Sequence, residues 1–154
     1  MPTKRQLRSS KSLRNRRKQK SKFPALLLQI VQVSDIILEV LDARFIEDTR
    51  NNEIEKIILK NKKKIIYVLN KADLTTKKES FPFKPFIYVS CKTRKGISEL
   101  RKIIKIEAQR VKKSEDNTYN RIQVGVIGYP NSGKSSVINL LKGRPSAGVG
   151  AQAG

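Results

Sequence analysis

One eight-residue segment, Gly128–Ser135, limits the fold of this 154-residue chain more than any other feature. Its sequence, Gly-Tyr-Pro-Asn-Ser-Gly-Lys-Ser, fits the pattern G-x-x-x-x-G-K-S, in which successive backbone N–H groups turn inward around phosphate oxygens. Both flanks agree with this reading, because the apolar run Val124–Ile127 precedes the segment and a helical pattern over 135–141 follows it. A glycine-rich turn without function fits that context poorly. The segment therefore predicts a site for nucleotide phosphates at the junction of a strand and a helix.

The residue types in this loop have distinct expected tasks. Lys134 should reach the β- and γ-phosphates, and the Ser135 hydroxyl should ligate Mg²⁺. The helix that begins here adds its positive N-terminal end. The residues expected to contact the phosphates are Pro130, Asn131, Ser132, Gly133, Lys134, Ser135 and Ser136.

Strand and helix patterns alternate along the preceding part of the chain. Buried-type strands are expected at 36–41, 65–69, 86–89 and 124–127, and helices at 23–34, 53–60, 98–113 and 135–141, with a polar linker over 112–120. The strands are apolar on both faces, which is typical of a parallel sheet covered by helices on both sides. The fold class is therefore α/β.

Two further loops follow buried strands and are candidates for reading the base. Asn70–Asp73 has the sequence N-K-x-D and follows the strand 65–69, at the carboxyl end where ligands bind in open α/β sheets. Asp73 can accept hydrogen bonds from the ring N–H and the exocyclic amine of guanine, a donor pair that adenine does not offer. Asn70 would tether loops or meet the base, and the Lys71 stem would cover the ring.

The third loop, Ser90-Cys91-Lys92, follows the strand 86–89 and is expected to contact the base as well. By itself this tripeptide is a weak signal, and its position at a third successive strand end makes it informative. Cys91 is interpreted as a small, half-buried residue without a redox role.

Basic residues are concentrated at the start of the chain. The formal net charge is +21, and residues 1–22 contain ten Lys or Arg and no acid. With two large apolar residues, this arm cannot bury enough surface to order itself and is expected to be disordered when alone. We expect it to lie along RNA phosphates. A solubilising tail and an Arg-rich transit peptide are the alternatives.

The remaining composition excludes several classes of site. The chain has no histidine and one cysteine, which excludes a His/Cys metal site, a Ser-His-Asp triad and an internal disulfide. A reducing, cytoplasmic location is therefore expected. No run of 18 apolar residues occurs, so no membrane span is expected.

The three motifs resemble those of translation-factor-type (TRAFAC) GTPases, but their order differs. In ordinary members the phosphate loop comes first, whereas here it follows N-K-x-D and S-x-K. This order is similar to that of the circularly permuted GTPases of the ribosome-assembly group. Val40–Arg44 and Thr49–Asn51 are similar to the D-A-R…R-N signature of that group. The chain departs from the common pattern at three positions, Ile46 (often Pro), Cys91 (often Ala) and Ser132 (often Val).

The resemblance implies a P-loop NTPase three-layer sandwich with a mostly parallel, circularly permuted sheet over residues 23–154. It implies a GTP hydrolase that uses GTP/GDP and Mg²⁺ and binds rRNA or a ribosomal subunit precursor in a nucleotide-dependent way. Lys134 and Asn131 would be the catalytic residues. Asn131 either helps to coordinate a potassium ion or only shapes the loop, and both interpretations stay open. A eukaryotic member would be nucleolar, and an organellar form would use residues 1–22 as its transit peptide.

Two expected features of such a domain are absent from the sequence. The first is a switch threonine: the segment Gly148–Gly154 is similar to the residues that precede it, and the sequence ends before it. The second is an Asp-x-x-Gly loop, since no Asp is followed by Gly three residues later. We therefore expect a domain that is incomplete at its C-terminus, with weak nucleotide binding and little turnover. The alternative is an RNA-binding structural module with a vestigial nucleotide pocket.

Overall fold

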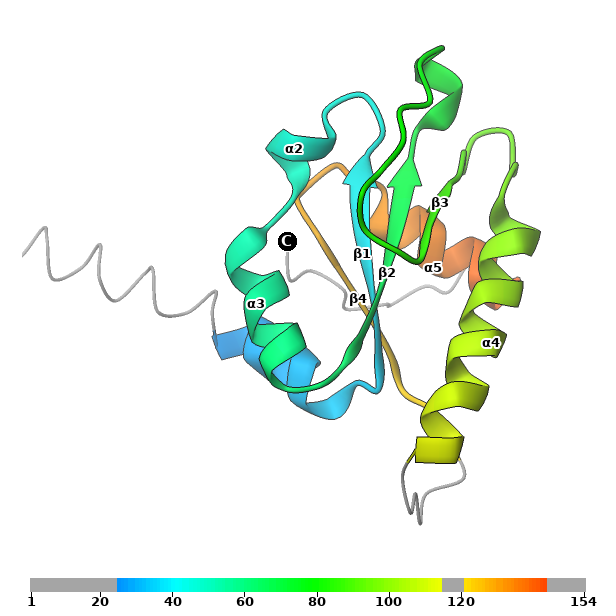
Figure 1. Cartoon of the computed structure of the whole chain (residues 1–154). Helices are drawn as coiled ribbons and strands as arrows, with labels where there is room; N and C mark the ends of the chain where they lie inside the picture. Colours follow the sequence, from blue (N-terminus) through cyan, green and yellow to red (C-terminus); the bar gives the residue numbers. More distant parts are fainter. Residues whose placement is uncertain (1–24, 115–120, 144–154) are drawn as a thin grey trace, which may run out of the picture.

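A computed structural model describes residues 25–114 and 121–143 of the chain. Its centre is a four-stranded sheet in the order β3-β2-β1-β4, in which every neighbouring pair is parallel (Figure 1). The strands are β1 (Ile36–Asp42), β2 (Lys64–Asn70), β3 (Phe86–Tyr88) and β4 (Val124–Gly128). The helices are a first helix over 25–33, α2 (Ile46–Thr49), α3 (Asn52–Lys60), α4 (Ile97–Ser114) and α5 (Lys134–Lys142), with a short 3-10 helix, η1 (Ala72–Leu74).

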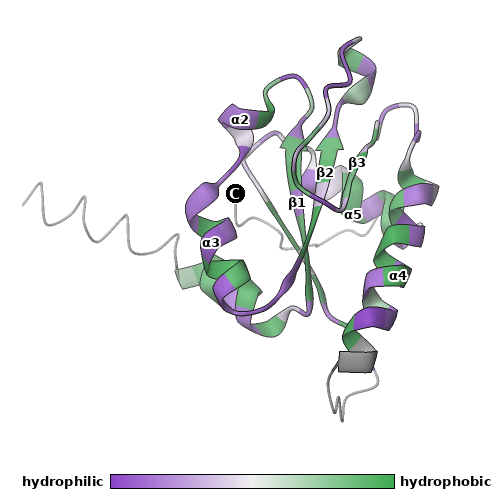
Figure 2. Ribbon diagram, in the orientation of Figure 1, coloured by the Kyte–Doolittle hydropathy of each residue, from purple (hydrophilic) through white to green (hydrophobic). Residues whose placement is uncertain are grey.

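The sheet is buried on both faces, which is why its strands are continuously apolar. All seven residues of β1 are buried, and alternate side chains enter two separate cores. One core holds Ile37 and Leu41, and the opposite one holds Ile36 and Leu38. Figure 2 shows the same pattern as apolar strands between helices that are apolar on one side only.

The helices complete a three-layer sandwich. Val31 of the first helix and Ile58 of α3 pack in the core with Ile37. Leu100 of α4 and Val137 of α5 pack in the core with Ile36. The expected α/β class, parallel sheet and helices on both sides are therefore confirmed.

The element boundaries differ from expectation in a few places. The helix α4 continues to Ser114, so the expectation of a linker beginning at residue 112 was wrong. The single-turn helices α2 and η1 were not expected, because a segment of three or four residues has no hydrophobic period to detect. The basic arm 1–22, residues 115–120 and the segment 148–154 lie outside the described residues. Within the described residues, no helix is both long and apolar enough to cross a membrane.

Candidate nucleotide-binding site

Parallel strands bring the three predicted loops to one end of the sheet. The register pairs Asp42 with Asn70, the last residues of β1 and β2, and Val40 with Gly128 at the end of β4. The loops that follow β2, β3 and β4 therefore emerge at the same end of the sheet, the upper end in Figure 1, with the end of β1 between those of β2 and β4. This is the edge where open α/β sheets bind ligands.

The phosphate loop folds over its own lysine. Lys134 Nζ donates to the carbonyl oxygen of Gly128 at 2.6 Å, and burial lowers the pKa of this lysine. Gly133 has a φ of +97°, and a Cβ at this position would overlap Asn70 Nδ2. Glycine is therefore required here by both backbone conformation and space. The side chains of Pro130, Asn131, Ser135 and Ser136 are exposed, as a ligand-contacting face requires.

Asn70 ties the three loops together. Its Nδ2 donates to the carbonyl oxygen of Ser132 at 2.9 Å, and its Oδ1 accepts from the backbone N–H of Cys91 at 3.3 Å. The side chain is 2% exposed. Of the two roles considered for Asn70, tethering loops is the one that its contacts support.

Lys71 crosses from the second loop to the first. Its backbone has a φ of +62°, and its Nζ donates to the carbonyl oxygen of Asn131 at 2.6 Å. Asn131 has a φ of +65°, a left-handed conformation that residues other than glycine rarely adopt. The same Nζ lies 3.3 Å from Asp42 Oδ2.

The Asp73 carboxylate is oriented by a hydrogen bond from the S-x-K loop. Ser90 Oγ donates to Asp73 Oδ1 at 2.7 Å and accepts from the backbone N–H of Thr93 at 3.2 Å. The hydrogen bond from Ser90 and the charge of nearby Lys92 lower the pKa of Asp73. A carboxylate in this position presents only acceptors, which suits a base edge that presents only donors.

Two other predicted residues have no such polar role. Burial raises the pKa of the half-buried Cys91 thiol, which agrees with a residue that is not redox-active. Ser132 is buried, and its Oγ has no hydrogen-bond partner among the described residues. Its backbone carbonyl, not its hydroxyl, joins the network through Asn70.

Two polar residues at this edge had no predicted chemical role. Asp42 Oδ1 accepts from the backbone N–H and the Nε of Arg44, both at 3.0 Å, and Asp42 Oδ2 accepts from Arg44 Nη2 at 2.8 Å. The sequence pattern places Asp42 and Arg44 only in the D-A-R signature, without a chemical role. An acid directly after a buried strand, at the same sheet edge as N-K-x-D, was the signal that could have found them.

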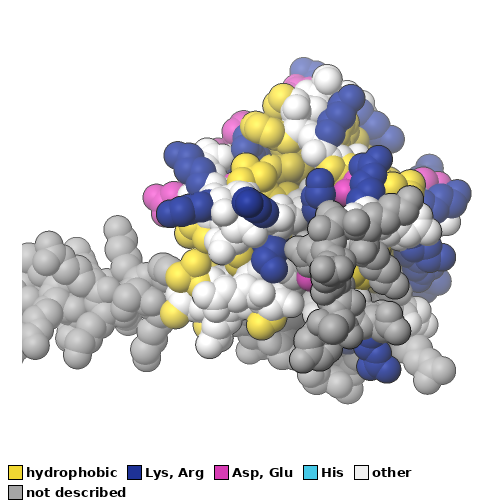
Figure 3. All heavy atoms as spheres, turned by 60° about the horizontal axis from the view of Figure 1, so that its bottom comes forward, with side chains coloured by type: hydrophobic (Ala, Val, Ile, Leu, Met, Phe, Trp, Pro, Cys, Tyr) yellow, Lys and Arg dark blue, Asp and Glu magenta, His cyan; other side chains and the backbone are white. Residues whose placement is uncertain are grey.

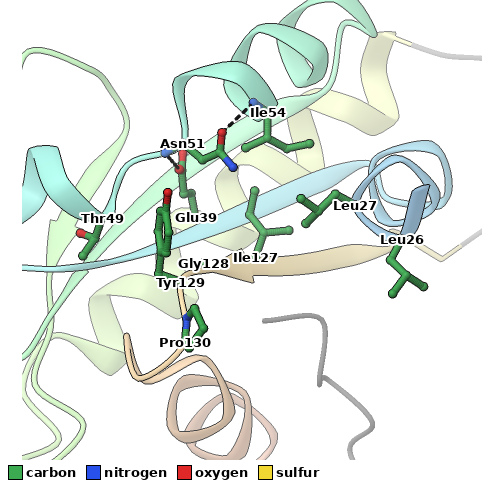
Figure 4. A pocket seen from close by; sticks show the side chains of 10 residues that line it. All are labelled: Leu26, Leu27, Glu39, Thr49, Asn51, Ile54, Ile127, Gly128, Tyr129 and Pro130. Atoms are coloured by element: carbon green, nitrogen blue, oxygen red, sulfur yellow. Dashed lines mark hydrogen bonds between the residues drawn. The ribbon is translucent and has the colours of Figure 1, made fainter. Parts of the chain in front are cut away.

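A cavity of about 390 Å³ lies beside the phosphate loop, between the first helix and β4. Figure 4 shows Tyr129 and Pro130 of the loop on one side and Leu26 and Leu27 on the other. Glu39, from the middle of β1, also lines it; Glu39 Oε1 accepts from the backbone N–H of Asn51 at 3.1 Å. The second carboxyl oxygen has no hydrogen-bond partner among the described residues, and burial raises the pKa of Glu39 to about 8.

Sequence comparisons agree with this geometry. A family model described as "50S ribosome-binding GTPase" matches residues 123–154. The chain is 46% identical over 132 residues to the "Uncharacterized GTP-binding protein MJ1464" of Methanocaldococcus jannaschii, covering 82% of this chain and 34% of that protein. It is 36% identical to the "Nuclear GTP-binding protein NUG1" of Saccharomyces cerevisiae, over 82% of this chain and 28% of NUG1. The chain thus spans about a third of the length of these curated relatives.

A solved structure is similar as well. The crystal structure of GNP-bound YlqF from T. maritima superposes with a TM-score of 0.54 and 26% sequence identity, covering 84% of this chain and 49% of that one. The three loops occur here in the permuted order N-K-x-D, S-x-K, phosphate loop, on a sheet of matching fold. The chain belongs to the family of circularly permuted GTP-binding proteins that includes YlqF and NUG1.

Proposed function

We propose that this chain binds GDP and GTP through the three loops and forms the nucleotide-binding part of a GTP hydrolase in ribosome assembly, whose nucleotide state controls binding to rRNA. The observation that carries the proposal is the network around Asn70, which joins the phosphate loop to the S-x-K loop. Lys134, the phosphate-binding candidate, and Asp73, the base-reading candidate, follow β4 and β2, the two strands that flank β1, at the same end of the sheet. The description of the family model as ribosome-binding supports the choice of partner.

Nucleotide selectivity tests this proposal directly. We expect fluorescent GDP to bind and fluorescent ADP to bind at least tenfold more weakly, because adenine lacks the donor pair that Asp73 accepts. The Lys134→Ala chain should lose about tenfold or more in GDP affinity, the scale of one charge-assisted hydrogen bond to phosphate. Equal binding of GDP and ADP would remove the role of Asp73, and no binding of either would favour an RNA module with a vestigial pocket.

Two ions belong to the proposal. Ser135, at the first turn of α5, would ligate Mg²⁺, and Asn131 would help to hold K⁺ beside the phosphates. The exposed side chain of Asn131 lies in a loop whose backbone is fixed by Lys71, which supports a positioned oxygen at this place. Any GTP hydrolysis measured in KCl should then exceed that in NaCl, and equal rates would exclude the potassium ion. A cytoplasmic or, in a eukaryote, nucleolar location would follow from ribosome assembly.

One surface favours RNA binding as a function in its own right. A groove of about 580 Å³ lies between the end of α3, the start of β2 and the last turns of α4. Its basic residues are Lys62, Lys63, Lys64, Lys84 and Arg110. Its single acid, Glu107, is paired with Arg110 at 2.7 Å, and none of the four lysines is ion-paired with another described residue.

The groove also offers an aromatic surface. Phe83 is 39% exposed at its edge, and bases of single-stranded RNA stack on such rings. The groove contains the start of β2, so it lies at the opposite end of the sheet from the nucleotide loops and leaves them free. Figure 3 shows Lys and Arg outnumbering Asp and Glu on one face of the described part. We propose that RNA phosphates bind along this groove.

Charge reversal tests the groove. The triple change Lys62→Glu, Lys63→Glu, Lys64→Glu should weaken binding of a labelled single-stranded RNA. It should also flatten the slope of log binding constant against log salt concentration by about two to three, because each lost phosphate contact removes about one from that slope. The control is Lys56→Glu, Lys102→Glu, Lys105→Glu, which changes the net charge equally at exposed lysines outside the groove. An equal loss in both triples would assign the effect to net charge alone.

A further inference from the structure

Asp42 ends β1 in the centre of the sheet, and its carboxylate has two cationic partners. It is 6% exposed, and its two oxygens accept three hydrogen bonds from Arg44. Asp42 Oδ2 also lies 3.3 Å from Lys71 Nζ. The hydrogen bonds from the Arg44 side chain hold the pKa of Asp42 at about 2, so the group is ionised at working pH. The carboxylate is thus a fixed negative charge in a strongly basic chain.

The partner Lys71 touches the phosphate loop. Its Nζ donates to the carbonyl oxygen of Asn131 at 2.6 Å, and Asn131 has the left-handed backbone conformation. A lysine ammonium is a strongly hydrated charge on a flexible stem, so it stays in one place only where a partner holds it. Asp42 is the described acid that pairs with it. A continuous path therefore runs from Asp42 through Lys71 to the carbonyl of Asn131.

We propose that Asp42 is a positioning residue for the nucleotide site, acting on the phosphate loop through Lys71. This inference rests on the proposed nucleotide binding. Asp42 does not touch the nucleotide. It keeps the Lys71 ammonium against the Asn131 carbonyl, which preserves the loop conformation in which the backbone N–H groups face phosphate. The backbone N–H of Arg44, which donates to Asp42 Oδ1, holds the carboxylate in the orientation that Lys71 needs.

Double-mutant analysis of GDP affinity tests this path. Asp42→Asn keeps the shape of the side chain and an acceptor for the Arg44 backbone N–H, and it removes the charge that holds Lys71. We expect it to weaken GDP binding about tenfold, and Lys71→Met to weaken it by a similar or larger factor. The double variant should bind no more weakly than Lys71→Met alone, because the two residues act in series. A merely structural role of Asp42 would instead give additive losses, which would overturn the proposal.

Arg44→Met provides the second variant. It removes the guanidinium and leaves the Asp42–Lys71 pair in place, so GDP affinity should fall by no more than about threefold. A loss of GDP affinity in Arg44→Met as large as that in Lys71→Met would show that the Arg44 guanidinium, and not Lys71 alone, connects Asp42 to the site, and it would overturn the path. This result can be read even if the Asp42→Asn chain does not fold. Circular dichroism establishes folding for each variant. Failure of the wild-type chain to bind GDP would reject the proposed function itself, whereas wild-type binding with additive losses rejects only this inference.

Discussion

The Asp73→Asn chain is expected to lose about a hundredfold or more in affinity for GDP and to prefer xanthosine diphosphate. The carboxylate of Asp73 would accept from both donors on the guanine edge, and a hydrogen bond to a charged group commonly contributes about 1.5–3 kcal/mol. An asparagine amide presents one acceptor and one donor group. Xanthine has a carbonyl oxygen where guanine has its exocyclic amine, so the new donor finds an acceptor there. Competition titrations with the two diphosphates measure the reversal.

The substitution should leave the loop itself unchanged. Ser90 Oγ donates to Asp73 Oδ1, and the amide oxygen of asparagine can accept the same hydrogen bond. Asp48→Asn is the matched control, because it removes one exposed carboxylate from α2, outside the three loops. A GDP affinity unchanged by Asp73→Asn would show that another group reads the base.

The fold was largely predictable because its strands are buried on both faces. Runs such as Ile36–Leu41 and Ile65–Leu69 are apolar without interruption, which periodicity detects directly. The phosphate loop was predictable for a different reason, since the close approach of Asn70 to Gly133 permits only glycine at that position. These features are local in sequence or impose a residue type.

The network behind the site was not predictable in the same way. The bond from Lys71 to the carbonyl of Asn131 joins residues 60 positions apart, and its geometry depends on strand order and loop conformation. Both residues have positive φ without being glycine, and Lys71 is not of a residue type enriched in that conformation, so the residue types give little hint of its turn. The role of Asp42 follows only when β1 and β2 are known to be neighbours in register.

The protonation state of Glu39, inside the core, also could not be predicted from the sequence. The sequence shows one acid in the apolar run 36–41, and the structure shows it buried, with Oε1 accepting from Asn51 N–H and Oε2 unpartnered. The charged groups that affect its pKa are Glu55, which raises it, and Arg50, which lowers it. Glu55 is itself paired with Arg50 at 2.8 Å and accepts from the Tyr67 hydroxyl at 3.3 Å. Burial is the largest cause, so Glu39 retains its proton near neutral pH.

Wild-type stability is therefore expected to fall between about pH 5 and pH 8, and Glu39→Gln should reduce that fall. In this range the unfolded chain ionises Glu39 near its ordinary pKa of 4.5, whereas the folded chain keeps the proton until about pH 8. The folded state then binds more protons, so the free energy of unfolding decreases as pH rises. At about 1.4 kcal/mol per pKa unit, the ceiling for this effect is roughly 5 kcal/mol.

Chemical denaturation at pH 5, 6, 7 and 8 measures the two slopes. Glutamine keeps the acceptor for the Asn51 N–H (Figure 4) and cannot ionise. The free energy of unfolding of Glu39→Gln should therefore rise relative to that of the wild type as pH rises. Glu53→Gln, an exposed change on α3, is the control and should follow the wild-type slope. If Glu39→Gln also followed that slope, Glu39 would be ionised in the folded chain. The cavity beside the phosphate loop would then contain a buried charge, and Arg50 would be the described cation to offset it.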